Sequence, residues 1–568
     1  MKMRHSKKRA GYALVIVMFF SGLGLMALTS ALKWTSTNVQ VTQRNNEYFN
    51  TVYAAEAASE KVLAKLGRDY LASGEGTVYS SLSTYQGMYP TSSENSYWNG
   101  FEFNDASGHA NKTYISRVSA STYTNLTSQY AGLNGLAATY RIVSNARRLG
   151  MVNPMTGAVK QEVQVAAIPL FQFAIFYAID LEINPGPNMN ITGRVHSNGD
   201  IYLQPQAILK FLSHVTAAGK IITGKSPKDP TARTPGSIVF SPGIEHDGGV
   251  SSLTLPIGTN NSPAAVHAVL EKPPAGEDKT SLMGQQRYYN KADLILQVAD
   301  GGVTATSGSF NNFATSIPAS QVAAFLSASS FYNKREGKTI QASEIDIAKL
   351  KNWSTTNTVL RAALARDISS IYIVDTRTQA ASTEVGVRLV NGQTLPSGGL
   401  TVATPDPVYI KGNYNAPTAA LGTSDTSGTK PASIVADAIT ILSTAWSDSN
   451  AGNGIGNRLA GNTTVNAAFL AGIVQSDGSH YSGGVENFPR FLEDWSGDTF
   501  TYNGSMVVMF DSRYAIVPWG GADVYSPPSR NWFFDVNFMD ATKLPPGTPS
   551  ILTVIRGSWA IVSPNSVL

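Results

Sequence analysis

The longest uncharged apolar stretch of the chain lies near its amino terminus, over residues 10–32. A helix rises about 1.5 Å per residue, so this stretch is long enough to cross the roughly 30 Å hydrocarbon core of a membrane. Five Lys or Arg residues precede it within residues 1–9, and only Lys33 follows closely. By the positive-inside rule, we expect a single pass through the cytoplasmic membrane, with the amino terminus inside and the body periplasmic or extracellular.

Helical periodicity continues beyond the apolar stretch. Apolar residues recur there at intervals of three, four and seven: Val41, Tyr48, Val52, Ala55, Val62 and Leu66. Such a stripe indicates an amphipathic helix that packs against a folded domain. We therefore predict one helix over residues 12–66, preceded by a basic leader over residues 1–11.

Two general interpretations of this start are a removable signal and a plain uncleaved anchor. A secretory signal has a shorter apolar core, followed by a small-residue cleavage site. Residues 29–31 (Thr-Ser-Ala) fit such a site, although the apolar stretch is longer than a signal needs.

A third interpretation comes from a resemblance. Residues 8–17 (KRAGYALVIV), where a glycine after basic residues precedes an aromatic residue, resemble the start of type IV pilin-like proteins of the PilX N-terminal family. Residues 49–58 (FNTVYAAEAA) are similar to the YAAEAG signature of that family. The resemblance implies cleavage by a prepilin peptidase between Gly11 and Tyr12. Ile16 stands where major pilins carry a glutamate, an absence associated with minor, tip-located subunits.

The same resemblance implies that the helix packs against the helices of other pilin or pseudopilin subunits. The residues that we expect on this assembly face are Ile16, Tyr48, Val52, Tyr53, Ala55 and Glu56.

Composition narrows the class of protein. A chain of 568 residues exceeds the size of one core, so two or more domains are expected. Charged residues make up 14%, and there are 50 glycines and no cysteines, which is typical of a β-rich exported protein without disulfides or thiolate metal sites. Of 43 Lys and Arg, five lie in residues 1–9, which leaves 38 against 39 Asp and Glu. The body therefore has no basic excess for binding nucleic acid.

Alternating apolar and polar residues predict strands over much of the remaining chain. The segments 113–118, 138–144 and 159–165 alternate with period two, which predicts a small antiparallel β domain over residues 67–170. Further on, residues 195–203 are echoed 20 residues later by 215–223, each with a glycine at a corner.

Stacked coils of a parallel β-helix need such a repeat. Similar alternation of small apolar residues returns at 408–414, 433–442 and 465–472. We therefore predict a mainly β protein whose body is a right-handed parallel β-helix, divided into one part over residues 171–265 and a second part over residues 381–520.

Between these parts, residues 266–380 have a mixed pattern that predicts a small α+β insertion. Strands are expected at 292–298 and 370–375, and helices at 319–327 and from Ser343 onward. The aromatic, proline-marked tail favours a C-terminal cap over residues 521–568. The alternative for the tail is a recognition surface that includes Trp495, Trp519, Arg530 and Trp532.

No catalytic, cofactor-binding or metal site is predicted. His196, Ser197 and Asp200 lie too close in sequence for a catalytic triad, so a coil corner is the simpler interpretation. Glu486, Glu493 and Asp494 suit a glycosidase pair less well than a solvated helix face. His109, His214, His246, His267 and His480 lack metal-ligand spacing, and no nucleotide-binding motif is present.

The sequence thus favours a non-enzymatic minor pilin or pseudopilin of a type IV pilus or a type II secretion-like assembly. The expected partners are the cytoplasmic membrane, other pilin subunits and a prepilin peptidase, with no cofactor and no nucleic acid. The alternatives are a membrane-anchored β-helix enzyme that acts on polysaccharide and an adhesin that uses the aromatic tail.

Overall fold

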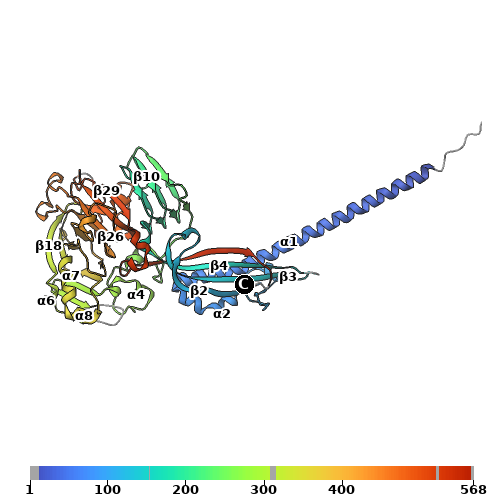
Figure 1. Cartoon of the computed structure of the whole chain (residues 1–568), viewed down its shortest axis with the longest axis horizontal. Helices are drawn as coiled ribbons and strands as arrows, with labels where there is room; N and C mark the ends of the chain where they lie inside the picture. The colour runs from blue at the N-terminus through green and yellow to red at the C-terminus, as the bar shows by residue number, and fades with distance from the viewer. Residues whose placement is uncertain (1–11, 152–153, 308–314, 520–522, 565–568) are drawn as a thin grey trace, which may run out of the picture.

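The chain has a long amino-terminal helix, a small sheet domain and a larger, predominantly β body (Figure 1). This computed structural model describes residues 12–151, 154–307, 315–519 and 523–564. The leader over residues 1–11, including Gly11 of the predicted cleavage site, lies outside the described residues.

Helix α1 (Tyr12–Ser80) is longer than the predicted 12–66. Residues 12–46 are exposed apart from Gly22, whereas the carboxyl-terminal part lies along the sheet domain (Figure 1). The buried stripe continues past the predicted end through Tyr70 and Val78, because both side chains pack into the same cluster as Val62 and Leu66. The backbone departs from helical geometry at Gly74, where φ is 76°. Helix α2 (Leu82–Gln86) follows directly.

The sheet domain is antiparallel, in the order β1-β3-β4-β30, with β2 also paired to β3. Its elements are β1 (Phe101–Asn104), β2 (Tyr114–Asn125), β3 (Asn134–Arg148), β4 (Thr156–Pro169), β30 (Ser550–Ile561) and the short helices η1 (Ser96–Gly100), η2 (Ser128–Tyr130) and η3 (Leu170–Gln172).

The sequence suggested that residues 521–568 cap the body. Strand β30, however, belongs to the sheet domain. It pairs with β4, with Ser550 opposite Pro169 and Ile551 opposite Ile168. The inward side chains of Ile551 and Ile555 are completely or almost completely buried, which explains why this strand joins the sheet domain. The whole body is thus inserted between two neighbouring strands of one sheet.

The first part of the body is a stack of short parallel strands. These are β5 (Ile175–Tyr177), β6 (Leu181–Ile183), β7 (Met189–Ile191), β8 (Val195–Ser197), β9 (Ile201–Leu203), β10 (Ile208–Phe211), β11 (Val215–Ala217), β12 (Ile221–Thr223), β13 (Ser237–Phe240) and β14 (His246–Gly248). Strands separated by 20 residues lie side by side, so Val195 is opposite both Ile175 and Val215. The repeat seen in the sequence corresponds to this pairing.

The second part of the body also consists largely of parallel pairs. Its strands are β15 (Leu294–Ala299), β16 (Gly302–Ser307), β17 (Thr315–Ile317), β18 (Leu326–Asn333), β19 (Lys338–Asp346), β20 (Ser370–Asp375), β21 (Thr383–Val390), β22 (Leu400–Ala403), β23 (Val408–Lys411), β24 (Ala432–Ala436), β25 (Ile439–Leu442), β26 (Thr463–Ile473), β27 (Arg490–Phe491), β28 (Thr499–Asp511) and β29 (Ser529–Phe534). The pair β28–β5 joins both parts into one sheet.

Helices are short in the body and lie between strands. They are α3 (Pro263–His267), α4 (Leu282–Gln286), α5 (Tyr288–Lys291), α6 (Ala319–Val322), α7 (Ile347–Thr356), α8 (Thr358–Leu364), η4 (Thr418–Ala420), η5 (Asp448–Asn450), η6 (Ile455–Asn457), η7 (Val485–Asn487), η8 (Val536–Met539) and η9 (Ala541–Lys543).

The segment 266–380 is not a separate α+β insertion. Strands β15 and β20 extend the sheet that contains β22 and β24, and β19 pairs in parallel with β21. Leu294, Ile345 and Ile371 belong to the same buried cluster as Val402 and Phe469. The predicted helix start at Ser343 was also wrong, since β19 runs to Asp346 and the Asp346 side chain caps α7.

The insertion of the body gives a stability prediction for β30. We expect Ile551→Ala to lower the free energy of unfolding by about 2–5 kcal/mol, because truncation of a fully buried side chain leaves a cavity between the sheet domain and the body. On the same strand Ile561, with 42% of its surface exposed, is a matched control. Ile561→Ala should change stability by less than about 0.5 kcal/mol in urea unfolding of the full chain. Equal losses in the two variants would contradict a structural role for β30.

Candidate functional site

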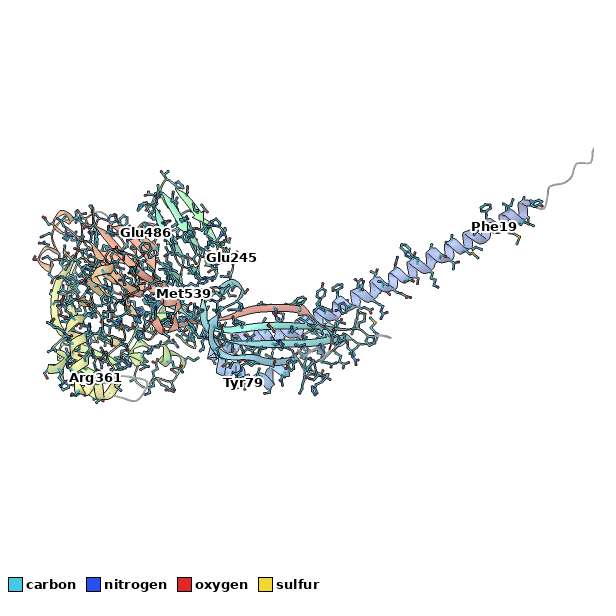
Figure 2. All side chains as sticks on the ribbon, in the orientation of Figure 1. Phe19, Tyr79, Glu245, Arg361, Glu486 and Met539 are labelled. Carbon is cyan, nitrogen blue, oxygen red and sulfur yellow. The ribbon has the colours of Figure 1, made fainter. Side chains whose placement is uncertain are left out.

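Among the described residues, most of the exposed large apolar side chains that are close in sequence lie on residues 12–46 of α1, which we call the free part of α1. Its exposed large apolar side chains include Tyr12, Leu14, Val15, Ile16, Val17, Met18, Phe19, Phe20, Leu23, Leu25, Met26, Leu28, Leu32 and Trp34. Figure 2 shows Phe19 near the tip of the helix, far from the body. Among the described residues, α1 is the helix long and apolar enough to cross a membrane, and its most apolar window has no buried residue. Isolated exposed apolar residues are normal, but a continuous patch of this kind marks an interaction surface.

The predicted assembly face of α1 divides into two groups. Ile16 and Tyr53 are exposed, and Tyr48 and Glu56 are half-buried. Val52 and Ala55, in contrast, are buried within their own chain, in one cluster with Ala146 of β3 and Val159 of β4. They are therefore already covered and are not part of a surface that another subunit can contact.

The contact between α1 and the sheet is close at the level of its backbone. The Ser144 hydroxyl donates a hydrogen bond to the Ala55 carbonyl oxygen over 2.5 Å. At Gly157 of β4, a Cβ atom would lie only 2.7 Å from the Thr51 carbonyl carbon, so a side chain there would push the helix away. The side chains of Glu60 on α1 and Arg556 on β30 form an ion pair, which links the helix to the last strand. The free part of α1 therefore continues from a helical part that is packed against the sheet domain.

His196 forms part of a buried corner. Its Nδ1 lies 2.8 Å from the Thr216 hydroxyl and its Nε2 lies 3.1 Å from the Asn198 side-chain oxygen. Burial lowers the pKa of His196 to about 4. The neighbouring Ser197 hydroxyl donates to the Ile179 carbonyl oxygen, and no bond between Ser197 and His196 occurs in the described residues. These contacts fit a structural corner and do not form a nucleophile–base pair.

The interpretation of Glu486, Glu493 and Asp494 as a solvated helix face was wrong. Glu486 and Glu493 are buried, and Asp494 is half-buried. Glu493 accepts hydrogen bonds from the Ser443 amide, over 2.7 Å, and from the Ser443 hydroxyl. Glu486 accepts a hydrogen bond from the Tyr481 hydroxyl. Burial raises the pKa of Glu493 to about 7. The two glutamates therefore accept hydrogen bonds in two separate turns, which the sequence alone did not reveal.

Sequence reasoning missed a series of aspartates at the corners of the second stack. Asp375, Asp406 and Asp437 are each 31 residues apart, and that spacing was the available signal. The Asp406 side chain accepts a hydrogen bond from the Asp375 amide over 2.9 Å. Asp437 accepts from the Arg513 amide over 2.6 Å and lies 3.6 Å from Nε2 of His267. Burial raises the pKa of Asp406 to about 8, so this carboxyl holds its proton at neutral pH.

Metal chemistry finds no support in these side chains. Within the described parts of the chain, no group of three or more His, Asp or Glu side chains is arranged to hold a metal ion.

Comparisons with known proteins leave the family open. No protein-family model matches the chain, and no curated protein matches it. Among solved structures, the chain is similar to the competence-associated pilin ComZ from Thermus thermophilus, with 11% identity over 91% of this chain and 97% of that chain, at a TM-score of 0.27. At that TM-score the similarity carries no argument about fold or function.

Asp406 gives a prediction with a definite sign. Because its folded pKa is raised, the stability that its proton contributes is present at low pH and is lost as pH rises through about 8. Between about pH 5 and about pH 8, the unfolding free energy of the wild-type chain should therefore fall by on the order of 3 kcal/mol relative to Asp406→Asn. Urea unfolding followed by tryptophan fluorescence measures this difference.

The exposed Asp247 supplies the control for this experiment. Asp247→Asn should follow the pH profile of the wild-type chain. A constant difference between the wild-type chain and Asp406→Asn across this range would show that Asp406 is ionised in the folded protein.

Proposed function

We propose that this chain is a structural subunit of a pilus-related assembly, held in the cytoplasmic membrane by the free part of α1. The observation that carries the proposal is the exposed apolar surface over residues 12–32, which measures about 30 Å along the helix and so matches the hydrocarbon core. In this arrangement the body lies outside the cytoplasm.

The architecture supports a pilin-like role. One helix provides an apolar free part and a second part that is seated on a small antiparallel sheet (Figure 1). The resemblance of residues 8–17 and 49–58 to the PilX N-terminal family points to the same role. We propose that other pilin or pseudopilin subunits contact α1 through Ile16, Tyr48, Tyr53 and Glu56, either in a type IV pilus or in a type II secretion-like assembly.

We further infer that the body is built as two stacks of a parallel β-helix. Support comes from parallel pairing at 20-residue spacing in the first stack and from the 31-residue aspartate spacing in the second. Such a body is a rigid domain that the helix holds outside the cytoplasm. The role is structural rather than enzymatic, because His196, Glu486 and Glu493 are engaged in turns that hold the stacks together.

Processing is the first test of the proposal. In cells that contain a prepilin peptidase, we expect the mature chain to begin at an N-methylated Tyr12, as measured by mass spectrometry of the purified protein. Gly11→Val should block this cleavage, while Gly22→Val in the apolar segment serves as a matched control and should leave it intact. A mature chain that begins near Trp34 would mean ordinary export, and an intact Met1 would mean a simple anchor. Either result would contradict processing as a pilin.

Assembly is tested separately, because crosslinking reports the contacts of α1 and not the position of the mature amino terminus. A photo-crosslinking amino acid in place of Tyr53, whose side chain is 62% exposed, should form adducts with other pilin-like subunits in membranes. The same probe in place of Tyr79, which is 50% exposed near the other end of α1, should form few or none. Adducts of equal yield at both positions would be incompatible with the proposed face.

A further inference from the structure

The first stack of the body ends in an incomplete turn. Along the chain, each turn supplies one strand to each of three sheets, in the orders β5-β8-β11-β14, β6-β9-β12 and β7-β10-β13. In the described residues, the turn that begins with β14 supplies no strand beside β12. Instead the chain turns at Gly249, where φ is 77°, and returns along the stack. Asn198 then holds the returning chain through hydrogen bonds of 2.8 Å to the amide and carbonyl of Leu253.

An open hollow of about 900 Å³ occupies the place of the missing strand. It is lined by Ile221, Ile222, Thr223, Phe240, His246 and Gly248, among other residues. Ile221 and Phe240 are partly buried hydrophobic residues that pack against the core of the body. The hollow therefore exposes the end of an apolar layer. In the two turns below, the same layer contains Leu181 and Ile201.

The backbone of β12 faces this hollow with free pairing capacity. One turn below, the Ile201 amide donates to the Lys220 carbonyl oxygen over 2.8 Å, and the Leu203 carbonyl accepts from the Gly224 amide over 2.8 Å. Ile221 and Thr223 are the equivalents of Ile201 and Leu203. Within the described residues β12 pairs with β9 alone, so the equivalent groups of Ile221 and Thr223 point to an empty position. A sheet edge of this kind accepts an added strand.

Charge at the corner indicates what such a strand carries. In the first two turns the corner residue is an aspartate: Asp180 accepts from the Asp200 amide over 2.9 Å, and Asp200 accepts from the Lys220 amide over 2.7 Å. At the open end this position is Lys220, and its side chain is exposed. A carboxylate one turn further would face an ammonium group, where a basic residue would be repelled.

We propose that this hollow binds an extended segment of a partner protein that adds to β12 as a parallel strand. The segment carries an acidic residue at the corner, next to Lys220, followed by aliphatic residues at the next and third positions, which lie beside Ile221 and Thr223.

The test uses a peptide with the sequence of residues 196–205 (HSNGDIYLQP), which carries the required acid and aliphatic residues in the register of β9. Fluorescence anisotropy with the full chain in detergent micelles should show saturable binding. Replacing the peptide aspartate by lysine should weaken binding about fivefold, as expected for a partly exposed ion pair. Lys220→Asp in the protein should reverse this preference, whereas Lys112→Asp, at an exposed site of the sheet domain, should leave it unchanged.

A second measurement guards against nonspecific binding. Peptide binding should slow hydrogen exchange of the Ile221 amide, because this amide then donates to the added strand. The proposal is overturned if the peptide does not bind. In that case Lys220 is a residue that prevents strand addition at this edge. The proposal is overturned as well if Lys220→Asp leaves the preference unchanged. If sedimentation shows dimers of the wild-type chain that are lost in Lys220→Asp, the occupant of the hollow is a second copy of this chain. That result would overturn the proposal of a partner protein.

Discussion

Pairing between β4 and β30 is the constraint on which the whole arrangement depends. These strands are neighbours in the sheet, yet 380 residues separate Pro169 from Ser550, its partner in the register. The body leaves the sheet domain from one strand and returns to it by the next. Because both connections lie at one end of the sheet, the body is attached at two adjacent points, and the sheet remains free to pack α1 against β3, β4 and β30.

Parallel stacking takes the place of disulfides in the body. The chain contains no cysteine. Its turns are instead held by backbone pairing, by an apolar interior that passes through both stacks, and by buried polar corners such as Glu493 with Ser443 and Asp406 with Asp375. Each buried polar group costs free energy unless it has a partner, so these corners also fix the register of the turns. The cost is partly avoided at Asp406, which keeps its proton.

The two surfaces with interaction potential lie at different places and differ in kind. The free part of α1 is an apolar cylinder, which suits lipid or other apolar helices. The hollow beside β12 is an edge with directional backbone groups and one lysine, which suits an extended segment. A subunit with both features can be part of an assembly through its helix and still contact another protein through its body.

The sequence by itself determined the parts that depend on local pattern. The apolar run, the basic flank, the helical stripe through Val52 and Leu66, and the 20-residue repeat are periodic features, and a period shows directly in a single chain. Only the tertiary structure decided where distant segments meet. It placed β30 beside β4, merged residues 266–380 into the common sheets, and buried Glu486 and Glu493. The physical reason is that strand partners are chosen by the fit of side chains across hundreds of residues, and alternation along one strand carries no information about its neighbour.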